Sequence, residues 1–269
     1  MPSWLSKIAT LLPPLTMLIG LEFVVQYPEI FWKIFGVIIG CVFFASLYLG
    51  RFLSQKKLKQ LVYLILPLFY TLSILALFVL AQKSYVQHFF IIGVSLILGI
   101  VLNNIATLSK YRFYSHKEVI LKSEEDKRKM IVCTTNEALV LLTTFFITAN
   151  LFGLIYLLSF PLWQALLIIV LVVFSLAYQF LCEIFTPSLA ALYTLITSLT
   201  ASQIFWSLTF WPTNYIANAV IVIVSIYIIL GILEYYSRQM LTRRLIKIYF
   251  LLGIITISSV LLTNQWVPR

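Results

Sequence analysis

The chain has 269 residues, of which 62% are hydrophobic, and its formal net charge is +10. Soluble globular proteins are about 45–50% apolar, so a soluble core could not absorb this excess. Apolar runs of about 20 residues recur along the chain, and runs of this length cross the hydrocarbon of a bilayer as helices. Because the runs are apolar on every side and do not alternate, the composition also argues against a membrane β-barrel.

The positive charge is explained by membrane orientation. Lys and Arg gather in the short connections between apolar runs, and the sequence has neither a nucleic-acid recognition motif nor a soluble basic domain. We therefore expect the lipid bilayer as the partner of this chain, and no nucleic acid.

The predicted fold is all-α: a polytopic integral membrane bundle of nine transmembrane helices, without a soluble domain. It forms a single membrane domain over residues 1–269. The predicted helices cover residues 8–27, 31–50, 61–81, 88–108, 123–158, 162–185, 188–210, 216–236 and 248–264. The polar segment 109–131 separates the fourth helix from the fifth.

The first two helices contain features that modify a plain span. Pro13 and Pro14 remove backbone donors, so we expect the first helix to bend or restart there, and a re-entrant first segment is the alternative. The sequence lacks a convincing cleavage site, which predicts that this helix is retained. Gly36 and Gly40 form a GxxxG pattern in the second helix, and we interpret it as ordinary helix packing.

The central polar segment predicts a helix start. Ser123 is a good N-cap residue, and the acidic residues 124–126 suit the positive end of a helix dipole. The fifth helix therefore begins at Ser123, outside the membrane, and continues to residue 158. For residues 110–122, a short surface helix and an irregular segment remain open.

The later helices differ in polarity. The fifth is the most polar span, with side chains at Asn136, Glu137, Thr143, Thr144, Thr148 and Asn150. We expect the sixth to be exposed to lipid along much of its length. The seventh carries small residues between Ala190 and Ser202, which suit close helix packing in lipid.

The distribution of cationic residues predicts the orientation. If segment 109–131 is cytosolic, then Lys7 and the connections 51–59 and 238–247 fall on the same side, so that 16 of the 19 Lys and Arg residues are cytosolic. We therefore predict a multi-pass protein of the cytoplasmic membrane, with the N-terminus in the cytosol and the C-terminus outside. The two basic hairpins are similar in spacing, which leaves an internal repeat open.

Ionisable and polar groups inside a membrane are costly and indicate function. The candidate polar site consists of Glu22, Asn103, Asn104, Asn136, Glu137, Thr144 and Thr148. The three cysteines and two histidines have no metal-site spacing, and no catalytic or nucleotide-binding motif is present. We therefore expect no cofactor, no metal and no catalytic residue.

Three function classes remain. The favoured one is a non-catalytic structural or accessory component of a membrane complex, whose partners are other membrane proteins or further copies of the chain. The alternative is a small-solute or ion transporter that uses the intramembrane Glu, Asn and Thr residues. A membrane-embedded lipid-modifying enzyme is the second alternative.

Overall fold

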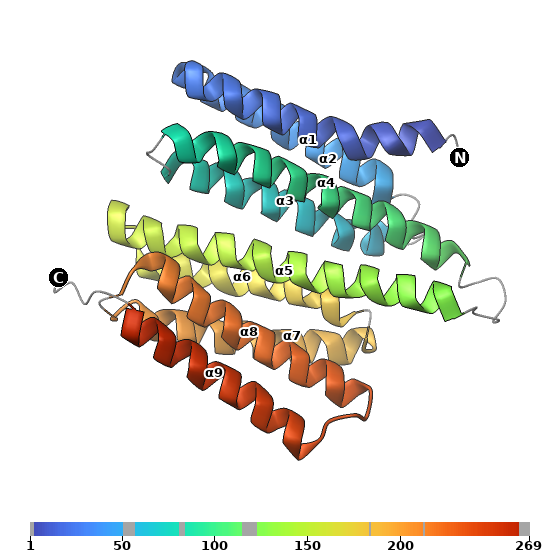
Figure 1. The fold of residues 1–269 in the computed structure, drawn as a ribbon, viewed down its shortest axis with the longest axis vertical. Helices are drawn as coiled ribbons and strands as arrows, with labels where there is room; N and C mark the ends of the chain where they lie inside the picture. The colour runs from blue at the N-terminus through green and yellow to red at the C-terminus, as the bar shows by residue number, and fades with distance from the viewer. Residues whose placement is uncertain are drawn as a thin grey trace. The chain divides into compact units, whose positions relative to one another are not determined.

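The structure is a computed structural model, and it describes the backbone of residues 3–50, 57–80, 84–114, 123–182, 184–211 and 213–263. Side chains are described over residues 4–50, 64–79, 87–107, 132, 134–182, 184–211 and 213–262. Within these residues every regular element is a helix, and none is a strand (Figure 1). The predicted all-α class is confirmed.

Nine α-helices and one 3-10 turn follow each other in this described part. They are α1 (Ser3–Gln26), η1 (Pro28–Ile30), α2 (Phe31–Gly50), α3 (Lys57–Leu80), α4 (Ser84–Tyr114), α5 (Ser123–Leu158), α6 (Leu162–Leu181), α7 (Pro187–Leu208), α8 (Tyr215–Ser237) and α9 (Arg243–Thr263).

Eight of these helices are long and apolar enough to cross a membrane. The remaining helix, α3, has 24 residues, but its described apolar part covers only Leu64–Val79. That α3 also crosses the membrane therefore stays a prediction. The fold is thus a polytopic helical membrane bundle.

The chain divides into two compact units, residues 1–139 and 140–269, with the boundary inside α5. In the first unit, α1 packs against α2 and α4, and α3 packs against α2 and α4. Close approaches occur at glycines: a Cβ on Gly20 would lie 2.7 Å from Ile34 Cγ2, and one on Gly99 would lie 3.5 Å from Pro14 Cγ. These contacts let α1 pack closely against both of its neighbours.

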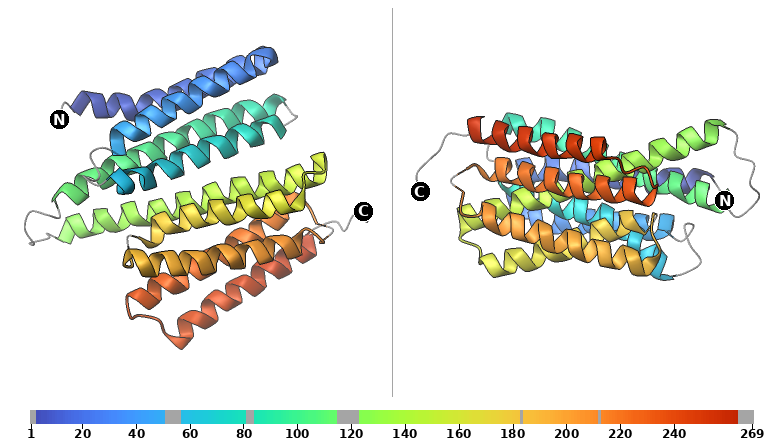
Figure 2. Two further views of the ribbon diagram at one scale, coloured as in Figure 1. Left: turned by 180° about the vertical axis from the view of Figure 1, so that it is seen from behind. Right: turned by 90° about the horizontal axis from the view of Figure 1, so that it is seen from below.

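The two prolines of α1 do not restart the helix. α1 is continuous from Ser3 to Gln26 with Pro13 and Pro14 inside it, and Figure 2 shows that it bends. Thr16 Oγ1 donates to the Pro13 carbonyl at 2.8 Å, a back-bond that often accompanies a bend. The expected bend is therefore present, and the helix is long enough to span.

The GxxxG pattern of α2 has no packing partner among the described residues of the first unit, which corrects our interpretation. A Cβ built on Gly36 or on Gly40 meets no atom within 4 Å among the described residues. The buried side of α2 lies elsewhere and contains Ile38, Val42 and Leu49. The small-residue pattern therefore lies on the open side of the helix.

The segment between α4 and α5 is shorter than predicted. α4 continues to Tyr114, six residues beyond the expected end at 108, because residues 109–114 contain no Gly or Pro to stop it. α5 begins at Ser123 and ends at Leu158, as predicted. The charged side chains of segment 109–131 lie outside the described residues.

In the second unit, α6 packs along α7, α7 packs against α8, and α8 packs against α9. We expected α6 to be exposed to lipid along much of its length, and half of its apolar stretch is buried inside the structure. Its most exposed large side chains form the narrow stripe Trp163, Leu167 and Leu171. α9 is the opposite case, with only 6% of its apolar stretch buried.

Candidate functional site

A polar side-chain pair joins α1 to α4 in the first unit. Glu22 comes from the last turns of α1, and His88 from the first turns of α4, which packs beside α1. His88 Nδ1 lies 2.9 Å from Glu22 Oε2 and 3.1 Å from Oε1. The two side chains are 47% and 34% exposed, so the pair lies at the surface of the unit. Glu22 thus has a partner on a neighbouring helix.

His88 is a residue that the sequence reasoning missed. The sequence could have indicated this pair, because successive membrane spans run in alternating directions. The end of the first span and the start of the fourth therefore reach the same membrane face, which places Glu22 and His88 at one level. The two residues are 66 positions apart in the chain, so no local sequence pattern connects them.

The predicted asparagines of α4 lie far from this pair. Asn103 is 15 residues beyond His88, which corresponds to about 22 Å along the helix. Asn103 is exposed, whereas Asn104 is buried and its Nδ2 has no partner among the described residues. The structure does not bring Glu22 together with Asn103 and Asn104.

The predicted polar residues of α5 divide into two kinds. Thr144 donates to the Val140 carbonyl at 2.8 Å and Thr148 donates to the Thr144 carbonyl at 2.7 Å, so both hydroxyl protons are used within the helix. Asn136 is buried, and neither its Oδ1 nor its Nδ2 has a partner in the described part. Glu137, the next residue, is half-buried.

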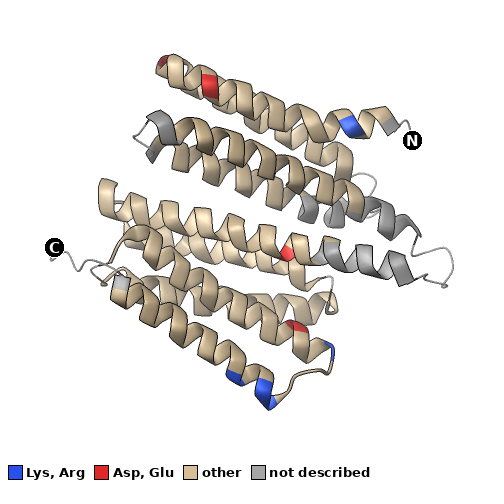
Figure 3. Ribbon diagram, viewed as in Figure 1, with Lys and Arg blue, Asp and Glu red and all other residues tan. Residues whose placement is uncertain are grey.

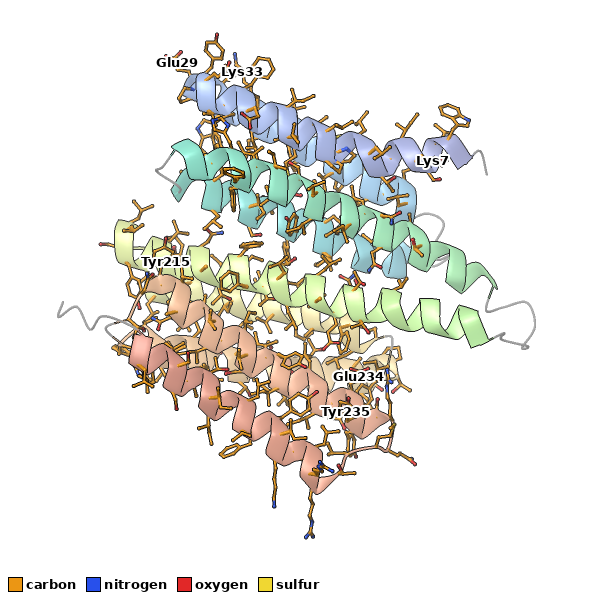
Figure 4. All side chains as sticks on the ribbon, viewed as in Figure 1. Lys7, Glu29, Lys33, Tyr215, Glu234 and Tyr235 are labelled. Carbon is orange, nitrogen blue, oxygen red and sulfur yellow. The ribbon has the colours of Figure 1, made fainter. Side chains whose placement is uncertain are left out.

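Apart from Glu137, which lies in the interior of α5, the charges of the described residues lie near helix ends (Figure 3). Lys7 lies at one end of α1, and Glu29 and Lys33 lie at the other end of the α1–α2 hairpin (Figure 4). At the end of α8, Arg238 forms an ion pair with Glu234 at 2.5 Å. This distribution is expected for a bundle with a hydrocarbon-facing middle, where charge is costly.

A buried polar network in the second unit was also missed. Asn218 Nδ2 in α8 donates to the Tyr156 hydroxyl of α5 at 2.9 Å and to the Leu208 carbonyl at the end of α7 at 3.2 Å. The Thr213 hydroxyl donates to Asn218 Oδ1. Asn218 is completely buried, so one amide ties three helices together.

Aromatic packing continues this network on α5. The Phe152 ring stacks on Phe205 of α7 at 4.2 Å between centroids, and it stacks on Tyr156 at 6.1 Å. Sequence reasoning noted the polar residues of α5 but not Asn218, because a single Asn in an apolar run gives no pattern. Only the packing of α5, α7 and α8 supplies its partners.

The His, Cys, Asp and Glu side chains of the described residues are dispersed. Among them, no group of three or more His, Cys, Asp or Glu side chains could hold a metal ion. Cys41 and Cys182 are free thiols. The side chains of His116, Cys133 and Glu183 lie outside the described residues.

These observations define a polytopic helical membrane protein with polar groups dispersed over several helices. Residues 37–263, more than half of the chain, match the family described as "Protein of unknown function (DUF5656)". The chain therefore belongs to this family. Neither a curated protein nor a solved structure matches it.

Proposed function

We propose that this chain is a non-catalytic structural or accessory component of a membrane complex, and that it assembles through the open face of α2. The observation that carries this proposal is the pair Gly36 and Gly40, which leaves open space where another helix can approach. Small residues at this spacing let transmembrane backbones come close enough for strong van der Waals packing.

The surroundings of the two glycines support such a contact. Val37 and Phe44 flank them and are 64% and 71% exposed, so they can form the sides of a helix–helix interface. Lys33, Gly36, Gly40 and Phe44 follow each other at spacings of three and four residues, which places them on one face. This face lies opposite the buried Ile38, Val42 and Leu49.

The charged groups also favour a non-catalytic role. The described carboxylates lie on separate elements, and two of them are held by neighbouring basic side chains, in the pairs Glu22–His88 and Glu234–Arg238. A lipid-modifying enzyme would instead gather acidic or histidine residues at one membrane face.

The test replaces Gly36 and Gly40 together by leucine and follows the assembly by native mass spectrometry from mild detergent. We expect the species heavier than one chain to be lost. Gly93→Leu is the matched control, because Gly93 also faces open space in α4 but has no second glycine one turn away. Assemblies that survive the double substitution unchanged would exclude this face as the interface.

The proposal also includes the membrane in which the chain lies and the side on which its termini lie. The excess of Lys and Arg in alternate connections supports a cytoplasmic membrane location with the N-terminus inside and the C-terminus outside. A chain with Cys41, Cys133 and Cys182 replaced by alanine and carrying Ser115→Cys should resist a membrane-impermeant maleimide in intact cells. Labelling of Ser115→Cys before cell lysis would show that the orientation is the opposite of the one proposed.

A second candidate function is small-solute or ion transport, and Asn136 favours it. A buried amide without partners on both its oxygen and its nitrogen offers hydrogen bonds to a passing polar solute. In proteoliposomes, Asn136→Leu should then abolish a solute flux that Asn103→Leu, on an exposed position, leaves intact. If wild-type vesicles are no more permeable to ions and small polyols than empty vesicles, this candidate is excluded.

A further inference from the structure

The hairpin of α6 and α7 contains two buried polar side chains that lack hydrogen-bond partners. Gln179 of α6 is 1% exposed, and both its Oε1 and its Nε2 are unpartnered among the described residues. Thr194 of α7 is completely buried, and its Oγ1 is likewise unpartnered. Three hydrogen-bonding atoms in the same helix pair are therefore left without a partner in the described part of the chain.

Both residues lie on the buried seams of their helices. The seam of α6 contains Ala165, Ile169, Val172 and Leu176 and ends in Gln179, at alternating spacings of four and three residues. The seam of α7 is a stripe of small buried residues, which contains Ala190, Thr194, Thr197, Ser198 and Ala201. Large apolar residues such as Leu192 and Leu199 lie on the exposed side of α7. The polar groups therefore belong to the packed side of each helix.

The connection between the helices places the two residues in neighbouring turns of the helix pair, about 7.5 Å apart along the helix axes. Gln179 precedes the C-cap Cys182 by three residues, or about 4.5 Å, and Thr194 follows the N-cap Thr186 by eight residues, or about 12 Å. Each Cα–Cβ bond leans toward the N-terminus of its own helix. In this antiparallel pair, Gln179 therefore leans away from the turn and Thr194 leans toward it, so the two polar groups approach each other.

We propose that Gln179 and Thr194 form a binding site for one small neutral ligand, and that this ligand is water. The Gln179 amide presents a donor as well as an acceptor, and the Thr194 hydroxyl can act as either. An occupant that donates to Oε1, accepts from Nε2 and bonds to Oγ1 satisfies all three atoms. Water does so in the smallest volume, whereas a metal cation would leave the amide N–H groups unpaired.

The apolar surroundings in a bilayer explain why a water molecule would be stable at this site. An amide or hydroxyl without a partner in an apolar interior is costly, and lipid cannot supply the missing hydrogen bonds. Buried waters typically make about three hydrogen bonds to polar groups that the protein leaves unpaired. A water between α6 and α7 would thus act as a hydrogen-bonded link between these two packed helices of the second unit.

A double-substitution cycle tests whether the two groups are linked. Gln179→Met and Thr194→Val keep the side-chain size and remove the polar atoms, and the unfolding of each variant and of the combination is followed in detergent. We expect each single substitution to destabilise the protein, and the double variant to lose less than the sum of the two. The coupling should change the unfolding equilibrium constant at least about twofold.

The control cycle pairs Gln179→Met with Thr197→Val. Thr197 lies on the same stripe, but its hydroxyl donates to the Tyr193 carbonyl at 2.8 Å, so this pair should be additive. Additivity in the Gln179–Thr194 cycle, or a single variant that is more stable than the natural chain, would overturn the proposal.

A second measurement identifies the occupant. Water-edited solid-state NMR of the protein in lipid should show magnetisation transfer from water to the Gln179 side-chain amide, and Thr194→Val should remove this signal. Coupling in the cycle without transfer from water would mean a direct contact between the two residues, and the water site would be rejected.

Discussion

The two units of the chain stabilise their polar groups in different ways. In the first unit, the carboxylate–imidazole pair Glu22–His88 lies at the surface, with both side chains more than a third exposed. In the second unit, the neutral amide of Asn218 is completely buried and bonds to groups from α5 and α7. Among the described residues, the Glu22–His88 pair thus lies where water or headgroups can reach it, whereas the fully buried polar side chains are neutral.

The physical reason for this difference is the cost of desolvation. A buried neutral amide can be satisfied by hydrogen bonds alone, whereas a buried charge also needs a partner of opposite sign. Removing a polar group should therefore have a larger effect in the second unit than in the first.

The largest effect is expected for Asn218→Leu. The substitution leaves the Tyr156 hydroxyl, the Thr213 hydroxyl and the Leu208 carbonyl without their amide partner, and we expect a loss of about 2–3 kcal/mol in unfolding free energy. Reversible unfolding in mixed micelles measures it. Tyr156→Phe removes only one hydroxyl and should cost less than half as much. Equal losses would show that the amide is not the centre of the network.

The next largest effect is expected for Gly231→Ala, which should weaken the packing of α9 against α8. A Cβ on Gly231 would lie 2.7 Å from Tyr249 Cζ and closer still to the Tyr249 hydroxyl. Overpacking of this kind costs about 1–3 kcal/mol, more than the helix propensity gained by the alanine. We expect faster tryptic cleavage after Arg243 or Arg244, because α9 is otherwise little buried. Gly93→Ala, in open space, should leave cleavage unchanged.

In the first unit, Tyr70→Phe should cost about 1 kcal/mol. The Tyr70 side chain is completely buried, and its hydroxyl donates to the Val94 carbonyl at 2.9 Å, which connects α3 to α4. Thermal unfolding of the two proteins under one detergent condition provides the comparison. A loss as large as that of Asn218→Leu would remove the proposed difference between the two units.

Much of the fold could be predicted from the sequence, because apolar runs of span length determine helices in a bilayer almost by themselves. α2 and α5 have the predicted bounds, since a proline-containing turn precedes the first and an N-cap serine begins the second. The end of α4 was predicted too early, because polarity was taken as a helix end. Polar residues without Gly or Pro can continue a helix beyond the membrane.

The candidate site was less predictable, because it depends on which helices are neighbours. Glu22 was selected for its cost in lipid, but its partner His88 follows only from the packing of α1 on α4. Asn218 has no sequence signal, since its partners come from α5 and from the residues around the α7–α8 turn. For Gly36 and Gly40 the motif was clear from the sequence, whereas only the structure distinguishes an occupied face from an open one.

The smallest effect is expected for Glu22→Gln. The glutamine keeps a hydrogen-bond acceptor within reach of His88 Nδ1, and a partly exposed ion pair contributes at most about 1 kcal/mol. We therefore expect the amount of membrane-inserted protein to equal that of the natural chain, and the unfolding free energy to change by less than about 0.5 kcal/mol. Quantitative immunoblotting of membrane fractions and the same unfolding assay measure both. His88→Gln is the matched variant and should behave alike. If either substitution abolished folding, the Glu22–His88 pair would be essential for the first unit. The proposed difference between the two units would then be wrong.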